Sequence, residues 1–367
     1  MDKIQQIRNN YIDLDKNVFT KYINIYPSTT LGSNVYGKII RWNIPTEHNN
    51  LSQLYIKATV TLTGNGTEPQ TGLGTRIAKL ITLKQKSNQT IIAEVNPQYS
   101  MNRLDELDGT RLYEQLSRSV ESTTDLSVIG VNTGEVIIPI PAWFCHKGNE
   151  LQTRYLGELE LELISNDNKE SMGLPVDVTS IDYELIIKYY ENTFYESCDF
   201  PKDIYGYAMY QNTKSVPSGS TSANILINCP FPVFASHFLC YSEDQDLYDI
   251  SRVVLKSSNV TLNDIDKRAM YNYDNDYDAN ISIGGTGSLP MYFNQKPDRK
   301  VMENNSYISF SQALYPCIAT VYFRSALASD ATLSVVSEYK KKFEISREGF
   351  ITTPLMGTFD ATGKHGI

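Results

Sequence analysis

The sequence predicts an all-β protein built from two consecutive antiparallel sandwiches. Segments in which apolar and polar residues alternate recur along most of the 367 residues, and turn-forming residues separate them. Tyr is abundant, at 25 residues, and with many Ile and Thr it favours half-buried strands over helices. The chain is also longer than one typical hydrophobic core requires, which favours two domains.

The first series of predicted strands begins at Tyr36. Its clearest member is L-Y-I-K-A-T-V-T-L at 54–62, where apolar residues alternate with Tyr, Lys and Thr. At 155–164, leucines alternate with glutamates, which is typical of a strand with one buried face. Residues 98–120 form the one predicted helical region, interrupted at Gly109. The expected strands are 36–45, 54–62, 78–85, 90–95, 126–131, 135–140, 155–164 and 180–190.

A second series of predicted strands follows, with turns at 217–220 and 284–287. Each series holds about eight strands, a number that favours the jelly roll, in which two four-stranded sheets pack face to face. The strand pattern does not separate a jelly roll from other Greek-key sandwiches. The expected strands are 204–210, 223–228, 234–240, 250–256, 281–283, 290–293, 306–310, 317–324 and 331–346.

The strand series divide the chain into four segments. We expect an N-terminal arm at 1–24, a first jelly roll at 25–192, a second jelly roll at 193–349 and a C-terminal tail at 350–367.

Charge and hydropathy exclude several classes of function. The net charge is −9, and no block of five or more basic residues occurs, so extensive direct nucleic-acid binding is not expected. The densest basic run, Lys340–Lys342, is interpreted as a solvated strand end. No apolar stretch approaches the length of a membrane span, and the first residues lack a secretory signal, so neither is expected.

No catalytic, cofactor-binding or metal site is assigned, and the chain is not expected to be an enzyme. The four histidines form no H-x-H or H-E-x-x-H pattern, and no G-x-S-x-G motif occurs. We interpret G-L-G-T-R-I at 72–77 as a hairpin loop rather than a dinucleotide loop. The cysteines are odd in number and never spaced C-x-x-C, so we expect free, mostly buried thiols. They are Cys145, Cys198, Cys229, Cys240 and Cys317.

The acidic stretch Y-D-N-D-Y-D-A-N at 273–280 has a partial calcium-loop pattern. Aspartates recur at every second position from Asp274 to Asp278, but Ala279 replaces the required glycine and Gly285 the bidentate glutamate. We interpret the stretch as a solvated loop and leave calcium binding open. Aromatic loops such as Y-N-Y-D-N-D-Y could stack on sugars, so a carbohydrate-binding sandwich remains an alternative.

One stretch, V-I-I-P-I-P-A-W-F-C-H-K-G-N at 136–149, combines two prolines with two aromatic residues. Pro139 and Pro141 lack a backbone donor, so they fit an edge strand or a strand that leaves its sheet. Trp143 and Phe144 then supply a large apolar surface. Taken alone, the stretch indicates an edge strand capped by aromatic side chains.

The same stretch resembles the end of the first jelly roll in double jelly-roll major capsid proteins. This family occurs in nucleocytoplasmic large DNA viruses, virophages, polinton-like viruses and the tailless-phage lineage. Other pieces follow in the family's order: F-T-K-Y-I-N-I-Y-P-S-T-T at 19–30, the strands at 39–62, and I-I-A-E-V-N-P-Q-Y-S-M-N-R-L-D-E-L at 91–107. I-N-C-P-F-P-V-F-A-S-H-F-L-C at 227–240 resembles a strand of the second half, although Phe231-Pro232 departs from it.

The resemblance implies a major capsid protein, located in the virion and assembled inside the host cell. Its homotrimers would have a pseudo-hexameric outline, tile an icosahedral shell, and contact neighbouring capsomers and penton or minor capsid proteins. Residues 1–24 and 350–367 would be interface arms, and contact with an internal membrane stays open. The alternatives are a minor or penton capsid protein, or a carbohydrate-binding β-sandwich of the adhesin or lectin type.

Overall fold

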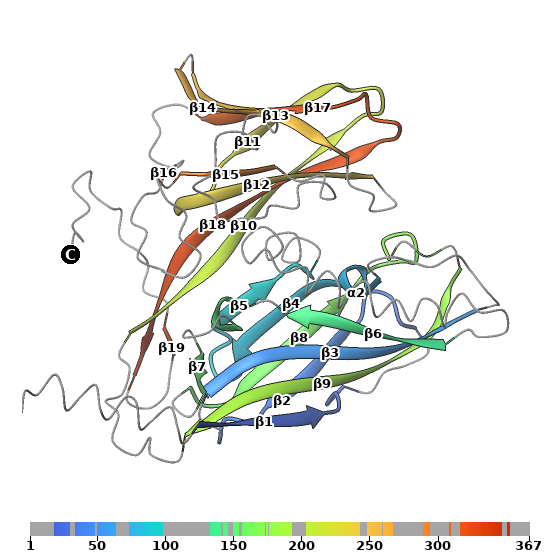
Figure 1. Ribbon diagram of the computed structural model, residues 1–367, viewed down its shortest axis with the longest axis vertical. Coiled ribbons are helices and arrows are strands. Elements are labelled where there is room, and N and C mark those ends of the chain that lie inside the picture. Colours follow the sequence, from blue (N-terminus) through green and yellow to red (C-terminus); the bar gives the residue numbers. More distant parts are fainter. Residues whose placement is uncertain are drawn as a thin grey trace, which may run out of the picture.

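The computed structural model contains two β-sandwiches joined end to end in the chain (Figure 1). Nearly every described residue lies in an antiparallel strand or in a turn between strands. The structure describes residues 18–29, 34–47, 50–63, 73–97, 133–140, 142–145, 150–153, 156–172, 174, 176–192, 203–242, 248–258, 260–266, 289–293, 308–309, 316–346 and 351–352.

The first sandwich consists of two facing sheets. One has the order β1-β9-β3-β6, with β7 added beside the start of β3, and the other has the order β2-β8-β4-β5. Their strands are β1 (Val18–Ile25), β2 (Ile39–Ile44), β3 (Asn50–Leu62), β4 (Ala78–Gln85), β5 (Ile91–Val95), β6 (Thr133–Ile140), β7 (Leu151–Gln152), β8 (Leu159–Ser165) and β9 (Val178–Asn192).

The second sandwich repeats this arrangement. One sheet has the order β10-β18-β12-β15, with β16 and β19 beside it, and the other has the order β11-β17-β13-β14. Its strands are β10 (Asp203–Val216), β11 (Ser222–Ile227), β12 (Pro232–Ser242), β13 (Ile250–Ser257), β14 (Val260–Asp266), β15 (Leu289–Tyr292), β16 (Ile308–Ser309), β17 (Cys317–Phe323), β18 (Ala331–Ile345) and β19 (Ile351–Thr352).

The two sandwiches have the same topology. When the eight main strands of each are counted from its own start, both have one sheet in the order 1-8-3-6 and one in the order 2-7-4-5. The short strands β7 and β16 also match, because each pairs with the start of the third strand of its sandwich. This confirms the prediction of two consecutive eight-stranded jelly rolls.

The irregularities of the strands match as well as their order. A β-bulge adds a residue to one strand and bends it locally, so its position is a specific feature of a sheet. Three register shifts recur at equivalent places in the two sandwiches. The shift at Leu51/Gln53 in β3 of the first sandwich corresponds to the one at Val233/Ala235 in β12 of the second. Likewise, the shifts at Ala78/Leu80 and Leu83/Lys84 in β4 correspond to those at Ile250/Arg252 and Leu255/Lys256 in β13.

Each sandwich has its own hydrophobic core, but the last long strand contributes to both. Val335 of β18 lies in the second core, whereas Phe343 and Ile345 near its end lie in the first. With 15 residues, β18 spans about 50 Å, because a strand rises about 3.3 Å per residue. It therefore leaves the second sandwich and runs beside β5 of the first (Figure 1).

The edge-strand interpretation of the proline-containing stretch holds for its described part. Within the described residues, β6 pairs only with β3, and Pro139 lies opposite Tyr55 in that pair. Proline is tolerated there because no further strand needs its missing donor. Pro141 and residues 146–149 lie outside the described residues.

Two local interpretations need correction. The segment at 72–77 is not a hairpin loop, because α2 (Leu73–Arg76) connects strands of different sheets. A Cβ on Gly74 would overlap the Ile137 carbonyl oxygen, so glycine is needed there. The predicted arm at 1–24 overlaps β1, which pairs with β9 from Val18 onward. There, Ile23 and its neighbours alternate in exposure because one face packs on the first core.

Several sequence predictions fall outside the described residues. These are the helical region at 98–120, the strands at 126–131 and 281–283, Cys198, and the acidic loop from Asp274 to Asp278. In the described part of the chain, no helix is long and apolar enough to cross a membrane.

Candidate functional site at the junction of the two sandwiches

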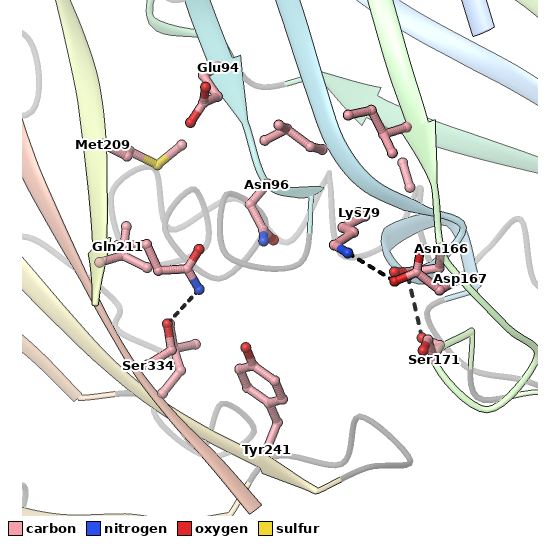
Figure 2. Close-up of a pocket in the computed structure, with 15 residues that line it drawn as sticks. Lys79, Glu94, Asn96, Asn166, Asp167, Ser171, Met209, Gln211, Tyr241 and Ser334 are labelled. Carbon is pink, nitrogen blue, oxygen red and sulfur yellow. Dashed lines mark hydrogen bonds and ion pairs between the residues drawn. The ribbon is translucent and has the colours of Figure 1, made fainter. Parts of the chain in front are cut away.

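The two sandwiches meet through unlike sheets. The outer face of β2-β8-β4-β5 in the first sandwich faces the outer face of β10-β18-β12 in the second, and a cavity of about 560 Å³ lies between them (Figure 2). The first sandwich contributes Ala78, Lys79, Leu80, Glu94, Asn96, Ile164, Asn166, Asp167 and Ser171 to the lining, and the second contributes Met209, Gln211, Leu239, Tyr241, Ser334 and Val336.

The cavity wall is polar on one side and mixed on the other. Lys79 and Asp167 of the first sandwich form an ion pair at 2.9 Å between Nζ and Oδ2 (Figure 2). In the second sandwich, the Gln211 amide donates to the Ser334 hydroxyl at 2.8 Å, beside an apolar group that includes Leu239 and Val336. The sheet of the second sandwich is therefore apolar in part on its outer face, as expected for a face that another domain covers.

Trp143 anchors the junction. It opens the short 3-10 helix η1 (Trp143–Cys145), directly after the edge strand β6, and is 7% exposed. Its indole nitrogen donates to the Ile92 carbonyl oxygen at 3.0 Å, and its ring stacks on Phe343 with 6.2 Å between centroids. Phe144 packs against it edge to face. Trp143 therefore does more than cap an edge strand, because it also contacts Phe343 of β18.

Gly206 of β10 is required by the position of Trp143. A Cβ built on Gly206 would lie 2.6 Å from Cε2 of the indole and 2.7 Å from its nitrogen. Atoms in proteins do not approach that closely without displacement. Only glycine lets the backbone of β10 pass this close to the ring.

Lys341 corrects the interpretation of the run Lys340–Lys342 as a solvated strand end. The Lys341 ammonium group donates to the Ile91 carbonyl oxygen at 3.1 Å and lies 5.2 Å from the centre of the Phe343 ring. Burial lowers the pKa of Lys341, while the nearby Glu94 opposes that shift. Burial likewise raises the pKa of Glu94. The junction thus encloses a partly desolvated pair of opposite charges.

The outer face of β12 and β18 also buries polar side chains that the sequence did not single out. His237 and Glu338 are 1% and 7% exposed, with 3.8 Å between the imidazole Nε2 and the carboxylate. The sequence signal for them is the loss of alternation along β12, F-A-S-H-F-L-C, where a strand with one solvated face would alternate. Burial of both faces of β12 indicates that a neighbouring element covers its outer side.

The described cysteines and acidic residues form no metal-binding cluster. Among the residues that the structure describes, no group of three His, Cys, Asp or Glu side chains could hold a metal ion. The four described cysteines are free thiols and three are buried, which confirms that prediction for them. Burial raises the pKa of the Cys145 and Cys240 thiols to about 12 and that of Cys229 to about 11.

The arrangement of two jelly rolls in one chain also occurs in proteins of known structure. No family model matches the sequence, and no curated protein matches it. Among solved structures, the capsid protein VP54 of PBCV-1 is similar with a TM-score of 0.68 and 12% identity, covering 92% of this chain and 97% of VP54. The chain has the double jelly-roll fold of viral major capsid proteins.

Two further double jelly-roll proteins extend the comparison. The Faustovirus major capsid protein is similar with a TM-score of 0.61 and 9% identity, over 90% of this chain and 91% of that one. The mavirus major capsid protein is similar with a TM-score of 0.58 and 11% identity, over 91% of this chain and 90% of that one. The resemblance inferred from the sequence is thereby confirmed for the fold of both halves.

Proposed function

We propose that the protein is a major capsid protein whose homotrimers have a pseudo-hexameric outline and tile an icosahedral virion shell. One observation carries the proposal: two sandwiches with the same strand order and the same bulges contact each other through unlike sheets. In this contact one sandwich presents one of its two sheets and the other sandwich presents the other. Each sandwich has both sheets, so the same contact can form again between the sandwiches of neighbouring chains.

The ring follows from the way this contact repeats. Contacts between unlike surfaces join copies head to tail and close into a ring when the rotation permits. The sheet β11-β17-β13-β14 of the second sandwich is equivalent to the junction sheet of the first, and β1-β9-β3 of the first is equivalent to that of the second. Three chains would place six equivalent sandwiches around one axis, which gives a nearly hexagonal tile.

Composition supports a role in assembly. A net charge of −9 favours solubility before assembly, and Tyr, at 25 residues, suits interfaces because its ring is apolar and its hydroxyl polar. Location in the virion, assembly inside the host cell, contacts with penton or minor capsid proteins, and interface roles for residues 1–24 and 350–367 belong to the same proposal. We propose no enzymatic activity.

Light scattering coupled to size-exclusion chromatography tests the proposal. We expect a particle of three times the 41.5 kDa subunit mass, and negative-stain images with a hexagonal outline. A stable monomer at micromolar concentration would contradict the proposal. Specific hits on a glycan array, together with a monomeric mass, would favour the carbohydrate-binding alternative instead.

A further inference from the structure

We propose that the interface between neighbouring copies repeats the junction within the chain, and that two defined patches form it. The proposal rests on the proposed function, since it names the surfaces through which the trimer forms. The arginine patch lies on β13, β14 and β17 and consists of Arg252, Asp264 and Tyr322. The tyrosine patch lies on β1, β3 and β9 of the next copy and consists of Tyr22, Lys57 and Glu184.

Strand registers establish which residues of the two sandwiches are equivalent. Counted from their matching bulges, Lys57 on β3 takes the place of Leu239 on β12. Lys57 lies opposite Glu184, and Leu239 lies opposite Ser334, so these partners are equivalent too. By the same registers Tyr22 on β1 takes the place of Met209 on β10. The tyrosine patch is therefore the counterpart of Met209, Leu239 and Ser334, which line the junction cavity.

The other pair of sheets gives a matching result. Leu80 lies opposite Ile164 after the bulge in β4, and Arg252 lies opposite Tyr322 after the bulge in β13. Glu94 on β5 is equivalent to Asp264 on β14. The arginine patch is therefore the counterpart of Leu80, Glu94 and Ile164, which line the cavity from the first sandwich.

The surface of the first sandwich has a hollow at the place equivalent to one wall of the junction cavity, with Tyr26, Pro27 and Thr29 of the segment after β1 also in its lining. The hollow, of about 540 Å³, lies on the outer face of β3 and β9 and includes Lys57, Thr59 and Glu184 in its lining. Their equivalents Leu239, Tyr241 and Ser334 form the corresponding wall at the junction. Residues of both sandwiches line the junction cavity, whereas residues of the first sandwich alone line this hollow.

The exposed aromatic residues support the assignment. Tyr22 is 61% exposed and Tyr322 is 38% exposed, although both occupy positions whose equivalents, Met209 and Ile164, lie at the junction. Large exposed aromatic side chains that cluster on a face mark interaction surfaces in soluble proteins. Covering the tyrosine patch with the arginine patch would bury both of these rings.

Each patch carries one cation and one carboxylate, which are Arg252 and Asp264 in the arginine patch and Lys57 and Glu184 in the tyrosine patch. Arg252 donates to Asp264 with 2.8 Å from Nε to Oδ1, and it lies 5.7 Å from the centre of the Tyr322 ring. Where the junction has apolar Leu80 and Leu239, the patches instead have Arg252 and Lys57. Charged groups at both faces keep a surface soluble until its partner arrives and then select the correct partner. We expect the guanidinium of Arg252 to approach Glu184 of the neighbouring copy.

Charge reversal tests the assignment. Arg252→Glu and Glu184→Lys should each raise the protein concentration needed for trimer formation by about ten-fold or more, because like charges would then face each other across the interface. The two changes combined in one chain should restore trimer formation. Lys86→Glu is the matched control: Lys86 is equally exposed, at 45% against 46% for Arg252, and is also ion-paired, but lies in neither patch.

Cross-linking provides a second measurement that does not depend on charge. In a Cys198→Ser background, the variant Tyr22→Cys/Tyr322→Cys, treated with a short bis-maleimide, should give a covalent trimer, while either single tyrosine-to-cysteine variant should not. The assignment would be overturned if both charge-reversal variants formed trimers at the same protein concentration as the wild type. It would also be overturned if Lys86→Glu weakened trimer formation as much as they do. Either result would leave the proposed function standing. A monomeric wild-type chain would overturn both.

Discussion

Replacing Gly206 with alanine tests whether the junction depends on the fit between β10 and the indole of Trp143. The added Cβ would lie 2.6, 2.7 and 2.9 Å from three indole atoms, all closer than contact allows. The ring cannot move away easily, because it is held by the Ile92 carbonyl and by Phe343. Overpacking of this kind costs about 1–3 kcal/mol, so we expect Gly206→Ala to lower the free energy of unfolding by that amount.

A double-mutant cycle with Trp143→Phe isolates this contact. Phenylalanine lacks the indole nitrogen and the fused ring, so Gly206→Ala should cost at least about 1 kcal/mol less in the Trp143→Phe background. Trp143→Phe alone should also destabilise, by about 1–3 kcal/mol, because the buried Ile92 carbonyl loses its donor. Urea unfolding followed by far-ultraviolet circular dichroism, at one fixed protein concentration, measures all four variants. Equal costs of Gly206→Ala in both backgrounds would refute the reasoning.

Two further predictions concern ionisable groups. Burial raises the pKa of Glu94, so the folded chain holds this proton more tightly than the unfolded chain, and stability falls as the pH rises through the folded pKa. Glu94→Gln should therefore raise the free energy of unfolding at pH 7 and remove that part of the pH dependence, as urea titrations across pH 4 to about 8 would measure; a destabilised variant with unchanged pH dependence would contradict this. The high thiol pKa values of Cys145, Cys229 and Cys240 predict that a Cys198→Ser/Cys317→Ser variant, which keeps only these three thiols, reacts with a disulfide reagent at pH 8 about a hundred-fold more slowly when native than when unfolded. Rapid native labelling would show that these thiols are accessible.

The sequence predicts the strands well because a jelly roll is assembled from local patterns. The alternation at 54–62 sets which face of β3 is buried, and Pro139 places β6 at an edge. Both signals depend on neighbouring residues only. The order in which strands pair came instead from the number of strands and from the resemblance.

The junction could not be predicted in the same way. Trp143, Gly206 and Phe343 are far apart in the sequence, and no periodic pattern links a ring to a distant glycine. The lysine run at 340–342 looked solvated because charge is read locally, whereas the length of β18 carries Lys341 to the first sandwich. The missing alternation along β12 was the one available signal that a second layer covers its outer face.

The contribution of β18 to both cores has a consequence for synthesis of the protein. Ribosomes produce the first sandwich well before Phe343 and Ile345 emerge, yet these two side chains complete its core. Until Phe343 has been synthesised, the ring of Trp143 lacks the aromatic side chain that stacks on it in the folded chain. A chain that ended before Phe343 would therefore lack two apolar side chains of the first core, so β18 links the packing of the first sandwich to synthesis of nearly the whole chain.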